Sequence, residues 1–222
     1  MRVSAISAIF PALPRPRSGI IRIVSKVKDL EQRLEKDEHQ LRLYQRISRH
    51  LTKQTDFRQS LRIIAGWVGE FLQPDSCLVY LLAQGELVLC AAAGPNPAAV
   101  GEVRLRLDEG LTGWVARERR MLAISREAYH DPRFKFFRDL PEDTFEAFLS
   151  APIIARNRVV GVINVQHRQP HAHTGDEMEM LATVGEMIGC LVTMASVDLE
   201  KFDEANFADL ILPAAAGLGP VG

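Results

Sequence analysis

The sequence predicts an α+β domain in which helices pack on an antiparallel sheet. Strand-like segments come mainly as hairpins, and the clearest one is residues 145–166, FEAFLSAPIIARNRVVGVINVQ. Its second arm is rich in β-branched residues, and Asn157 suits the tight turn between the arms. Amphipathic helical stripes come before and after the hairpins. With 222 residues, 47% of them hydrophobic, the chain is long enough to bury one good core.

Composition argues against several classes of protein. A net charge of −1, from 27 basic and 28 acidic residues, gives no electrostatic case for direct nucleic-acid binding. Three scattered cysteines predict reduced thiols rather than a disulfide framework or a zinc ribbon. No apolar run approaches the roughly 20 residues of a membrane span, and Pro11 interrupts the weakly signal-like residues 3–13. We therefore expect a cytoplasmic protein.

The N-terminal part divides into a tail and a helix. Residues 1–24 are rich in Pro, Arg and Ser and predict a disordered tail. Residues 25–54 predict a coiled-coil-like helix, with Asp37 and Ser48 interrupting its apolar stripe. The stripe consists of Val27, Leu30, Leu34, Leu41, Tyr44 and Leu51. Two interpretations stay open, a seam between two copies and a helix that packs on its own domain.

The globular domain is predicted over 55–197, followed by a flexible tail at 198–222. Asp56 and Gln59 have the spacing of a capping box at the start of its first helix. In chain order we expect a helix at 57–72, a hairpin of 77–82 and 86–92, a strand at 103–107 and a glycine-rich entry into a short helix at 109–116. A strand at 121–125, a long loop at 126–144, the hairpin at 145–166 and a helix ending near 197 follow. Thr174 and Glu177 supply a second capping box for that last helix.

Both faces of the 145–166 hairpin are mostly apolar, so we expect both to be covered. In its first arm, one face carries Ala147, Leu149, Ala151 and Ile153, and the other carries Phe148, Ser150, Pro152 and Ile154. Pro152 conflicts with an interior strand, because proline cannot donate to the ladder and belongs at an edge or bulge.

The long loop is the predicted functional element, since a loop of this length is uncommon in a compact domain unless it has a role. Its aromatic and charged side chains are of the kind that line small-molecule pockets, which have apolar walls and a few polar groups. The candidate ligand-binding residues are Trp114, Tyr129, Asp131, Arg133, Phe134 and Phe148. The guanidinium of Arg133 can bind a carboxylate or another anion through two parallel hydrogen bonds. The alternative is that Asp131 begins a turn and Phe134 fills the domain's own core.

Two other groups of residues, three histidines and two cysteines, do not predict a metal site or a reactive thiol. His167, His171 and His173 lie in a polar loop in which we see no cysteine or carboxylate placed to complete a metal site, so a solvated loop is predicted and no metal. Cys77 and Cys90 lie on paired strands, where they could face each other, and we expect them to be buried core residues.

Five segments in this order resemble a GAF domain, and the resemblance covers about 57–197. They are EGLTGWVA, the short strand after it, HDPRF, the 145–166 hairpin and the helix capped by T-x-x-E. The pattern is similar to the GAF domain at the front of the nitrogen-related phosphotransferase enzyme I. The resemblance implies a six-stranded antiparallel sheet with helices on both faces. It places the first and last helices on one face, and the short helix and long loop around a pocket on the other.

The resemblance also implies a non-enzymatic sensory or regulatory module. Such a module binds a small molecule or a partner and relays its state through flanking helices. In this chain the stripe from Val27 to Leu51 and the last helix suggest a homodimer as the relay, and a separate output protein is a possible partner. The cofactor is unknown, and His130 leaves haem open. Two alternatives remain, a ligand-free dimerisation module and a free methionine sulfoxide reductase. Residues 94–150 contain no cysteine, which argues against the reductase and against an attached bilin.

Overall fold

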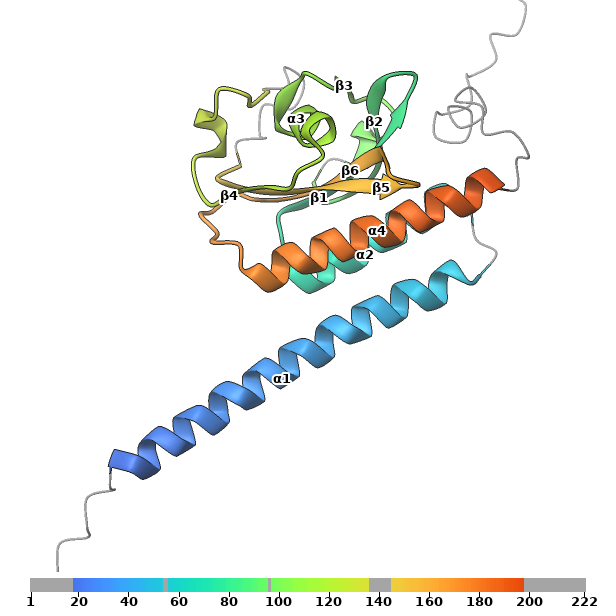
Figure 1. Ribbon diagram of the computed structural model, residues 1–222. Coiled ribbons are helices and arrows are strands. Elements are labelled where there is room, and N and C mark those ends of the chain that lie inside the picture. Colours follow the sequence, from blue (N-terminus) through green and yellow to red (C-terminus); the bar gives the residue numbers. More distant parts are fainter. Residues whose placement is uncertain (1–17, 54–55, 96, 136–144, 198–222) are drawn as a thin grey trace, which may run out of the picture. The chain divides into compact units, whose positions relative to one another are not determined.

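The computed structural model describes residues 18–53, 56–95, 97–135 and 145–197 (Figure 1). The chain divides into an N-terminal unit, residues 1–41, and a larger unit, residues 42–222. The predicted tail at 198–222, and the predicted N-terminal tail up to residue 17, lie outside the described residues.

A six-stranded antiparallel sheet is the centre of the larger unit, with the strand order β3-β2-β1-β6-β5-β4. The strands are β1 (Ser76–Ala83), β2 (Glu86–Ala93), β3 (Arg104–Arg106), β4 (Leu122–Ile124), β5 (Ala147–Ala155) and β6 (Arg158–His167). The predicted α+β class, the six antiparallel strands and both hairpins are therefore confirmed.

Both hairpins turn through two residues of positive φ. Gln84 and Gly85 have φ of 52° and 81°, and Arg156 and Asn157 have φ of 48° and 62°. Left-handed conformation at both central positions is typical of the turn whose twist matches that of paired strands. The turns lie where the sequence predicts them.

Pro152 occupies an interior strand at a point where that strand has only one partner. It pairs with Val162 of β6, whereas the short β4 pairs with β5 only from Phe148 to Ser150. Beyond Ser150 the other edge of β5 has no β4 partner, so proline removes no hydrogen bond to β4 there.

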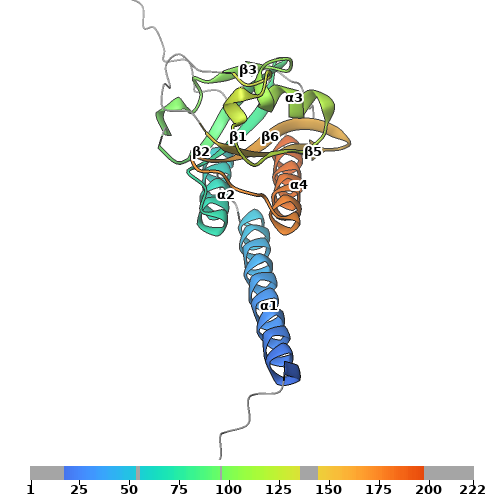
Figure 2. The same cartoon turned by 90° about the vertical axis from the view of Figure 1, so that its left-hand side faces the viewer.

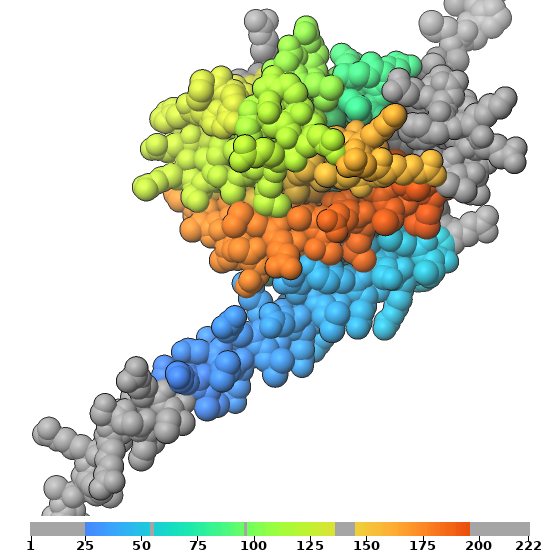
Figure 3. Space-filling model, in the orientation of Figure 1, coloured from blue at the N-terminus to red at the C-terminus, as the bar shows by residue number. Residues whose placement is uncertain are grey.

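Helices cover both faces of the sheet (Figures 1 and 2). The α2 helix (Phe57–Leu72) and the α4 helix (Gly175–Val197) lie on one face, and α3 (Gly110–Glu118) lies on the other. The space-filling view shows α4 and the α3-containing segment on opposite sides of the β5–β6 hairpin (Figure 3). The described residues also form two short 3₁₀ turns, Pro97–Ala99 and Ala128–His130.

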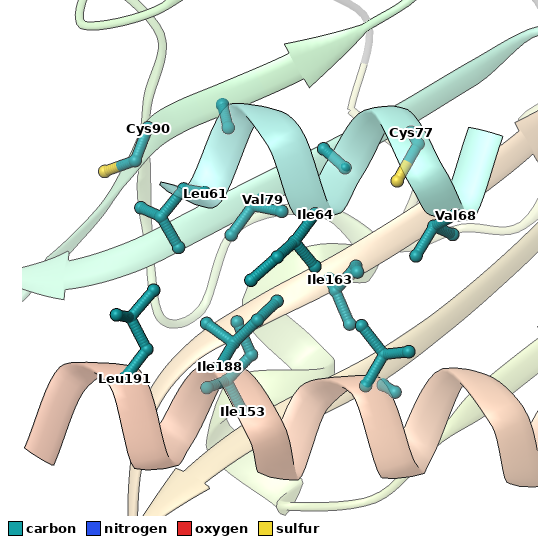
Figure 4. Close-up of a cluster of buried hydrophobic side chains, with 14 of the residues drawn as sticks. Leu61, Ile64, Val68, Cys77, Val79, Cys90, Ile153, Ile163, Ile188 and Leu191 are labelled. Atoms are coloured by element: carbon teal, nitrogen blue, oxygen red, sulfur yellow. The ribbon is translucent and has the colours of Figure 1, made fainter. Parts of the chain in front are cut away.

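The larger core lies between the sheet and the α2–α4 pair (Figure 4). Leu61 and Ile64 of α2 meet Ile188 of α4 over this face, and all three are fully buried. Leu149 of β5 points into the same core, whereas its neighbour Phe148 belongs to a cluster on the α3 face. The predicted alternation of the hairpin is confirmed.

The α4 helix is, within the described residues, the one helix long and apolar enough to cross a membrane by length and composition. Its apolar residues Met180, Leu181 and Val184 are fully buried in the domain core. Gly189 lies so close to the Ile154 carbonyl that a side chain there would collide with it. Packing on the sheet therefore accounts for the composition of α4.

The α1 helix runs from Ser18 to Leu51, so it begins before the predicted residue 25. In the N-terminal unit, four apolar residues of the predicted stripe are exposed: Val27 at 47%, Leu30 at 64%, Leu34 at 61% and Leu41 at 55%. In the larger unit the same helix packs on its own domain through Leu43 and Ile47, which are buried in the main core. These two residues lie one position before Tyr44, which belongs to the predicted stripe, and Ser48, which interrupts it. Packing on its own domain is therefore observed for the end of α1, and a seam between two copies along the exposed stripe stays a prediction.

Candidate functional site

A small cavity of about 60 Å³ lies between the sheet and α3. Its walls are mainly apolar and come from β1, β2, β3, β5 and β6, from α3, and from the segments after β2 and β4. They include Leu78, Tyr80, Leu89, Leu105, Leu111, Phe134 and Phe148. Polar side chains on its lining are Ser76, Thr112, Lys135, Asn164 and Gln166. Apolar walls with a few convergent polar groups are the usual character of a ligand site.

The alternation of β6 brings two amides to this cavity. Asn164 and Gln166 line it, whereas Ile163 and Val165 point into the α2–α4 core. Because successive residues of a strand face opposite sides, one strand contacts both the cavity and the helices behind the sheet.

A buried chain of hydrogen bonds links α3 to the sheet beside the cavity. The Ser150 hydroxyl donates to Asn164 Oδ1 at 2.6 Å, and Asn164 Nδ2 donates to Thr112 Oγ1 at 2.8 Å. Ser150, Asn164 and Thr112 are all buried. Since an unpaired buried polar group is costly, this chain fixes how α3 sits on the sheet.

Gln166 differs from its neighbours because its buried Oε1 has no hydrogen-bond partner among the residues that the structure describes. Buried polar atoms in proteins are nearly always paired, so this oxygen requires a physical explanation. It lines the cavity, where a bound molecule with an N–H or O–H group could donate to it.

An ion pair forms part of the wall on the side of α3. Lys135 Nζ lies 2.6 Å from Glu109 Oε1, and the hydrogen bond with Lys135 lowers the pKa of Glu109. Gly110, with φ of 69°, lies between them, and a Cβ at this position would come within 3.3 Å of Lys135 Cβ. The positive φ and the close approach both favour glycine here.

The structure brings two of the six predicted site residues to the cavity, Phe134 and Phe148. Arg133 instead binds Asp131 through two hydrogen bonds, at 2.8 and 2.6 Å, and its guanidinium lies 4.6 Å from the centre of the Trp114 ring. The hydrogen bonds from Arg133 lower the pKa of Asp131. Trp114, Asp131 and Arg133 thus form one cluster next to the cavity lining rather than part of it.

Tyr129, the sixth predicted residue, also bonds within the protein. Its hydroxyl donates to Glu146 Oε1 at 3.0 Å, and this hydrogen bond raises the pKa of Tyr129. Glu146 Oε2 also accepts a hydrogen bond from the Glu127 backbone amide at 2.9 Å. These two hydrogen bonds to Glu146 connect the start of β5 to the segment after β4.

The polar lining residues were absent from the predicted set, although the sequence carries a signal for them. Asn164 and Gln166 are polar residues at alternate positions of a largely apolar strand, and Ser150, the hydrogen-bond partner of Asn164, is a polar residue in the mostly apolar β5. A polar residue on a covered face requires a partner, and that requirement points to a site.

The expectation for the three-histidine loop is wrong in one respect. A carboxylate does lie beside it, because the capping box turns Glu177 back toward the loop, where its oxygens lie 3.1 and 3.2 Å from His171 Nε2. Each of His167, His171 and His173 is half-buried rather than solvated. Burial lowers the pKa of His173 to about 4.

Cys77 and Cys90 do not face each other, because Cys77 pairs with Ala93 and a bulge shifts the register between Val79 and Tyr80. They are well separated in the core on the α2–α4 side of the sheet (Figure 4). Burial raises the pKa of both thiols to about 12. Cys190, on α4, is exposed.

The family model described as GAF domain matches residues 56–191, more than half of the chain. The chain belongs to the GAF-domain family. The matched region runs from the cap of α2 to the last turns of α4 and contains every strand of the sheet.

This GAF domain is similar to parts of two phosphotransferase proteins. It is 27% identical over 162 residues to a phosphoenolpyruvate-dependent phosphotransferase system protein of Salmonella typhimurium, covering 72% of this chain and 22% of that protein. It is 26% identical to the crystal structure of the GAF domain from an Acinetobacter phosphoenolpyruvate-protein phosphotransferase, with a TM-score of 0.66 and coverage of 74% of this chain and 98% of that one. The chain thus spans about a fifth of the length of its curated relative.

A free methionine-R-sulfoxide reductase from Neisseria meningitidis, solved in complex with its substrate, has the same fold. The likeness has a TM-score of 0.58 and 16% identity, and it covers 69% of this chain and 87% of that one. At this identity the likeness concerns the fold alone.

Proposed function

We propose that this GAF domain is a sensory or regulatory module whose cavity on the α3 face binds a small polar molecule. The observation that carries the proposal is the buried, unpartnered Oε1 of Gln166 on the cavity lining. An N–H or O–H of the ligand would donate to it, and Phe134 and Phe148 would hold the apolar part.

The size of the cavity sets a condition on the ligand. About 60 Å³ is far below the roughly 300–1,000 Å³ of a typical ligand site, so anything larger than a few atoms must displace part of the wall. Phe134 and Lys135 are the lining residues suited to this, because they lie in the segment after β4 rather than in a strand of the sheet, and the Lys135 side chain is 30% exposed. The cluster of Arg133, Asp131 and Trp114 would anchor the segment that moves.

Strand β6 offers a route from the cavity to the flanking helices. A ligand on Asn164 and Gln166 contacts the same strand whose Ile163 and Val165 pack against the α2–α4 side. A ligand shifts such an equilibrium only by binding one arrangement better than the other. The exposed stripe of α1 supports a homodimer as the part of the protein that responds to this shift. As expected from the sequence, the signal would pass to a separate output protein, and the protein would be cytoplasmic.

The proposed module is not a thiol enzyme. None of the described cavity-lining residues is a cysteine, and Cys77 and Cys90 lie on the opposite face with pKa values raised to about 12. A thiolate is the reactive form, so neither residue is suited to attack a sulfoxide in the cavity. An assay that couples free methionine sulfoxide reduction to NADPH through thioredoxin should show no turnover.

Equilibrium dialysis against a small-metabolite extract of the source cells tests the binding proposal. Mass spectrometry of the two compartments should find a metabolite enriched with the wild type and absent with Gln166→Met, which keeps the side-chain volume but removes the amide. Gln45→Met, an exposed residue on α1, is the matched control and should enrich the same metabolite. Equal enrichment by Gln166→Met would contradict the assignment of the site.

A further inference from the structure

We propose that His167, His171 and His173 bind one divalent transition-metal ion, with Zn²⁺ as the expected occupant. Nitrogen atoms of the three rings, one from each, all lie within 4.8 Å of one another. The site is separate from the α3-face cavity, and the proposal does not depend on a ligand there.

The spacing is close to what a metal needs. Zinc holds imidazole nitrogens at about 2.0–2.1 Å, which places tetrahedral ligands about 3.4 Å apart. Nitrogen atoms at most 4.8 Å apart therefore need to approach by no more than about 1.4 Å, which small rotations of the rings provide.

The rings are already packed together. His167 and His171 stack with centroids 4.2 Å apart, and His173 lies 4.9 Å from His171 and 5.6 Å from His167. Three protonated imidazoles at these distances would repel one another, whereas neutral imidazoles around a shared cation would not.

Two of the rings have contacts suited to ligands. Within the described part of the chain, the Nε2 of His173 is buried without a hydrogen-bond partner, and the same ring is hydrogen-bonded to the Ile124 backbone. That combination leaves one ring nitrogen available, as in metal-binding histidines whose other nitrogen is held by a carbonyl. His171 Nε2 meets the Glu177 carboxylate at 3.1 Å, which orients this ring in the same way.

The backbone around the cluster is anchored. The amide of His171 donates to the Ser125 carbonyl at 2.9 Å, and that of Glu146 donates to the His167 carbonyl at 2.9 Å. The amide of Arg168 donates to Asp75 Oδ2 at 2.7 Å, which also brings a second carboxylate near His167. A bound ion would therefore join the end of β6 and the start of α4 to the segment after β4.

The ligand set indicates the class of metal. Imidazole nitrogen suits Zn²⁺, Cu²⁺, Ni²⁺ and Fe²⁺ and disfavours Mg²⁺ and Ca²⁺, which take oxygen ligands. Three histidines leave a fourth position for water or for a group from another molecule.

The test is a competitive titration of tag-free protein, dialysed against chelator, with Zn²⁺ and a chromophoric chelator. The wild type should bind one Zn²⁺ per chain. His171→Ala should weaken binding by at least about 100-fold, and Glu177→Gln by about 10- to 100-fold. His39→Ala and His130→Ala remove histidines outside the cluster and should bind like the wild type.

Substitution of His173, whose Nε2 is fully buried, could disturb folding, and circular dichroism with thermal unfolding identifies any variant that is misfolded. The His171 variants therefore decide the test, and His171→Gln is the more conservative of the two. Substitution of Co²⁺ supplies a second readout, because a four-coordinate site absorbs visible light much more strongly than hydrated Co²⁺ does. Absence of stoichiometric binding by the wild type, or unchanged binding by a folded His171→Ala, would overturn the proposal.

Discussion

At Gln166 the domain keeps a buried amide oxygen without a protein partner, in a strand whose neighbouring positions are well packed. If this oxygen is kept for a ligand, its removal should stabilise the empty protein. We expect Gln166→Met to raise the free energy of unfolding by about 1 kcal/mol, since an unsatisfied buried group costs about 1–3 kcal/mol. Urea unfolding measures this, and a clear loss of stability would show that Gln166 has a structural role.

Asn164 gives the opposite expectation, because its amide is fully used. Asn164→Ala removes the acceptor of Ser150 and the donor to Thr112. It should lower the free energy of unfolding by about 2–4 kcal/mol, from two lost buried hydrogen bonds and the space left behind. Thr183→Ala, whose hydroxyl bonds only within α4, is the control and should change stability by less than about 1 kcal/mol.

The Asp131–Arg133 pair predicts a pH dependence. Because Arg133 lowers the pKa of Asp131 in the folded state, the pair contributes stability above the ordinary value of 3.8. That contribution is lost as the pH falls through the lowered pKa. With Arg133 about a third exposed, Asp131→Asn should cost no more than about 1 kcal/mol at pH 7, and the difference should vanish in acid. A difference that persists at pH 2 would contradict this cause.

At the scale of elements, close packing of α4 on β5 predicts contrasting effects for two glycines. A Cβ at Gly189 would collide with the Ile154 carbonyl, whereas a Cβ at Gly66 of α2 meets nothing within 4 Å. Gly189→Ala should therefore destabilise by at least about 1–3 kcal/mol. Gly66→Ala should be neutral or stabilising by up to about 1 kcal/mol, because alanine favours a helix. Equal effects in thermal unfolding would rule out the close contact as the cause.

Hairpins, helices and their caps follow from local chemistry, so the sequence alone predicts them. The Asn157 turn and the capping box of Thr174 and Glu177 depend on residues within a few positions of each other. The position of Pro152 does not, because it depends on where the short β4 ends. The role of Leu43 and Ile47 likewise depends on a core formed by distant segments.

The candidate site was predictable only in part, for the same reason. Phe134 and Phe148 reach the cavity as expected from their apolar character. Arg133 in isolation looks like an anion-binding residue, but its guanidinium donates two hydrogen bonds to the Asp131 carboxylate, two residues away. The histidine cluster depends on the fold of a whole loop, which spacing along the chain does not specify.

At the scale of the whole molecule, the exposed α1 stripe predicts self-association. Leu30→Glu with Leu34→Glu should convert a dimer to a monomer in sedimentation equilibrium, because both residues lie on the stripe and are more than 60% exposed in one chain. Lys28→Glu, an exposed position outside the stripe, is the control and should leave the dimer intact. A wild type that remains monomeric at high micromolar concentration would remove the homodimer from the proposed relay.

Native mass spectrometry of the protein isolated from its own host tests the central claim most directly. The account predicts a wild-type chain carrying an additional small-molecule mass, one per chain, that is released on unfolding. It predicts that Gln166→Met, prepared in the same way, folds but lacks this mass. A wild type without any retained molecule, or a Gln166→Met variant that retains the same one, would contradict the claim that the cavity on the α3 face is the sensory site.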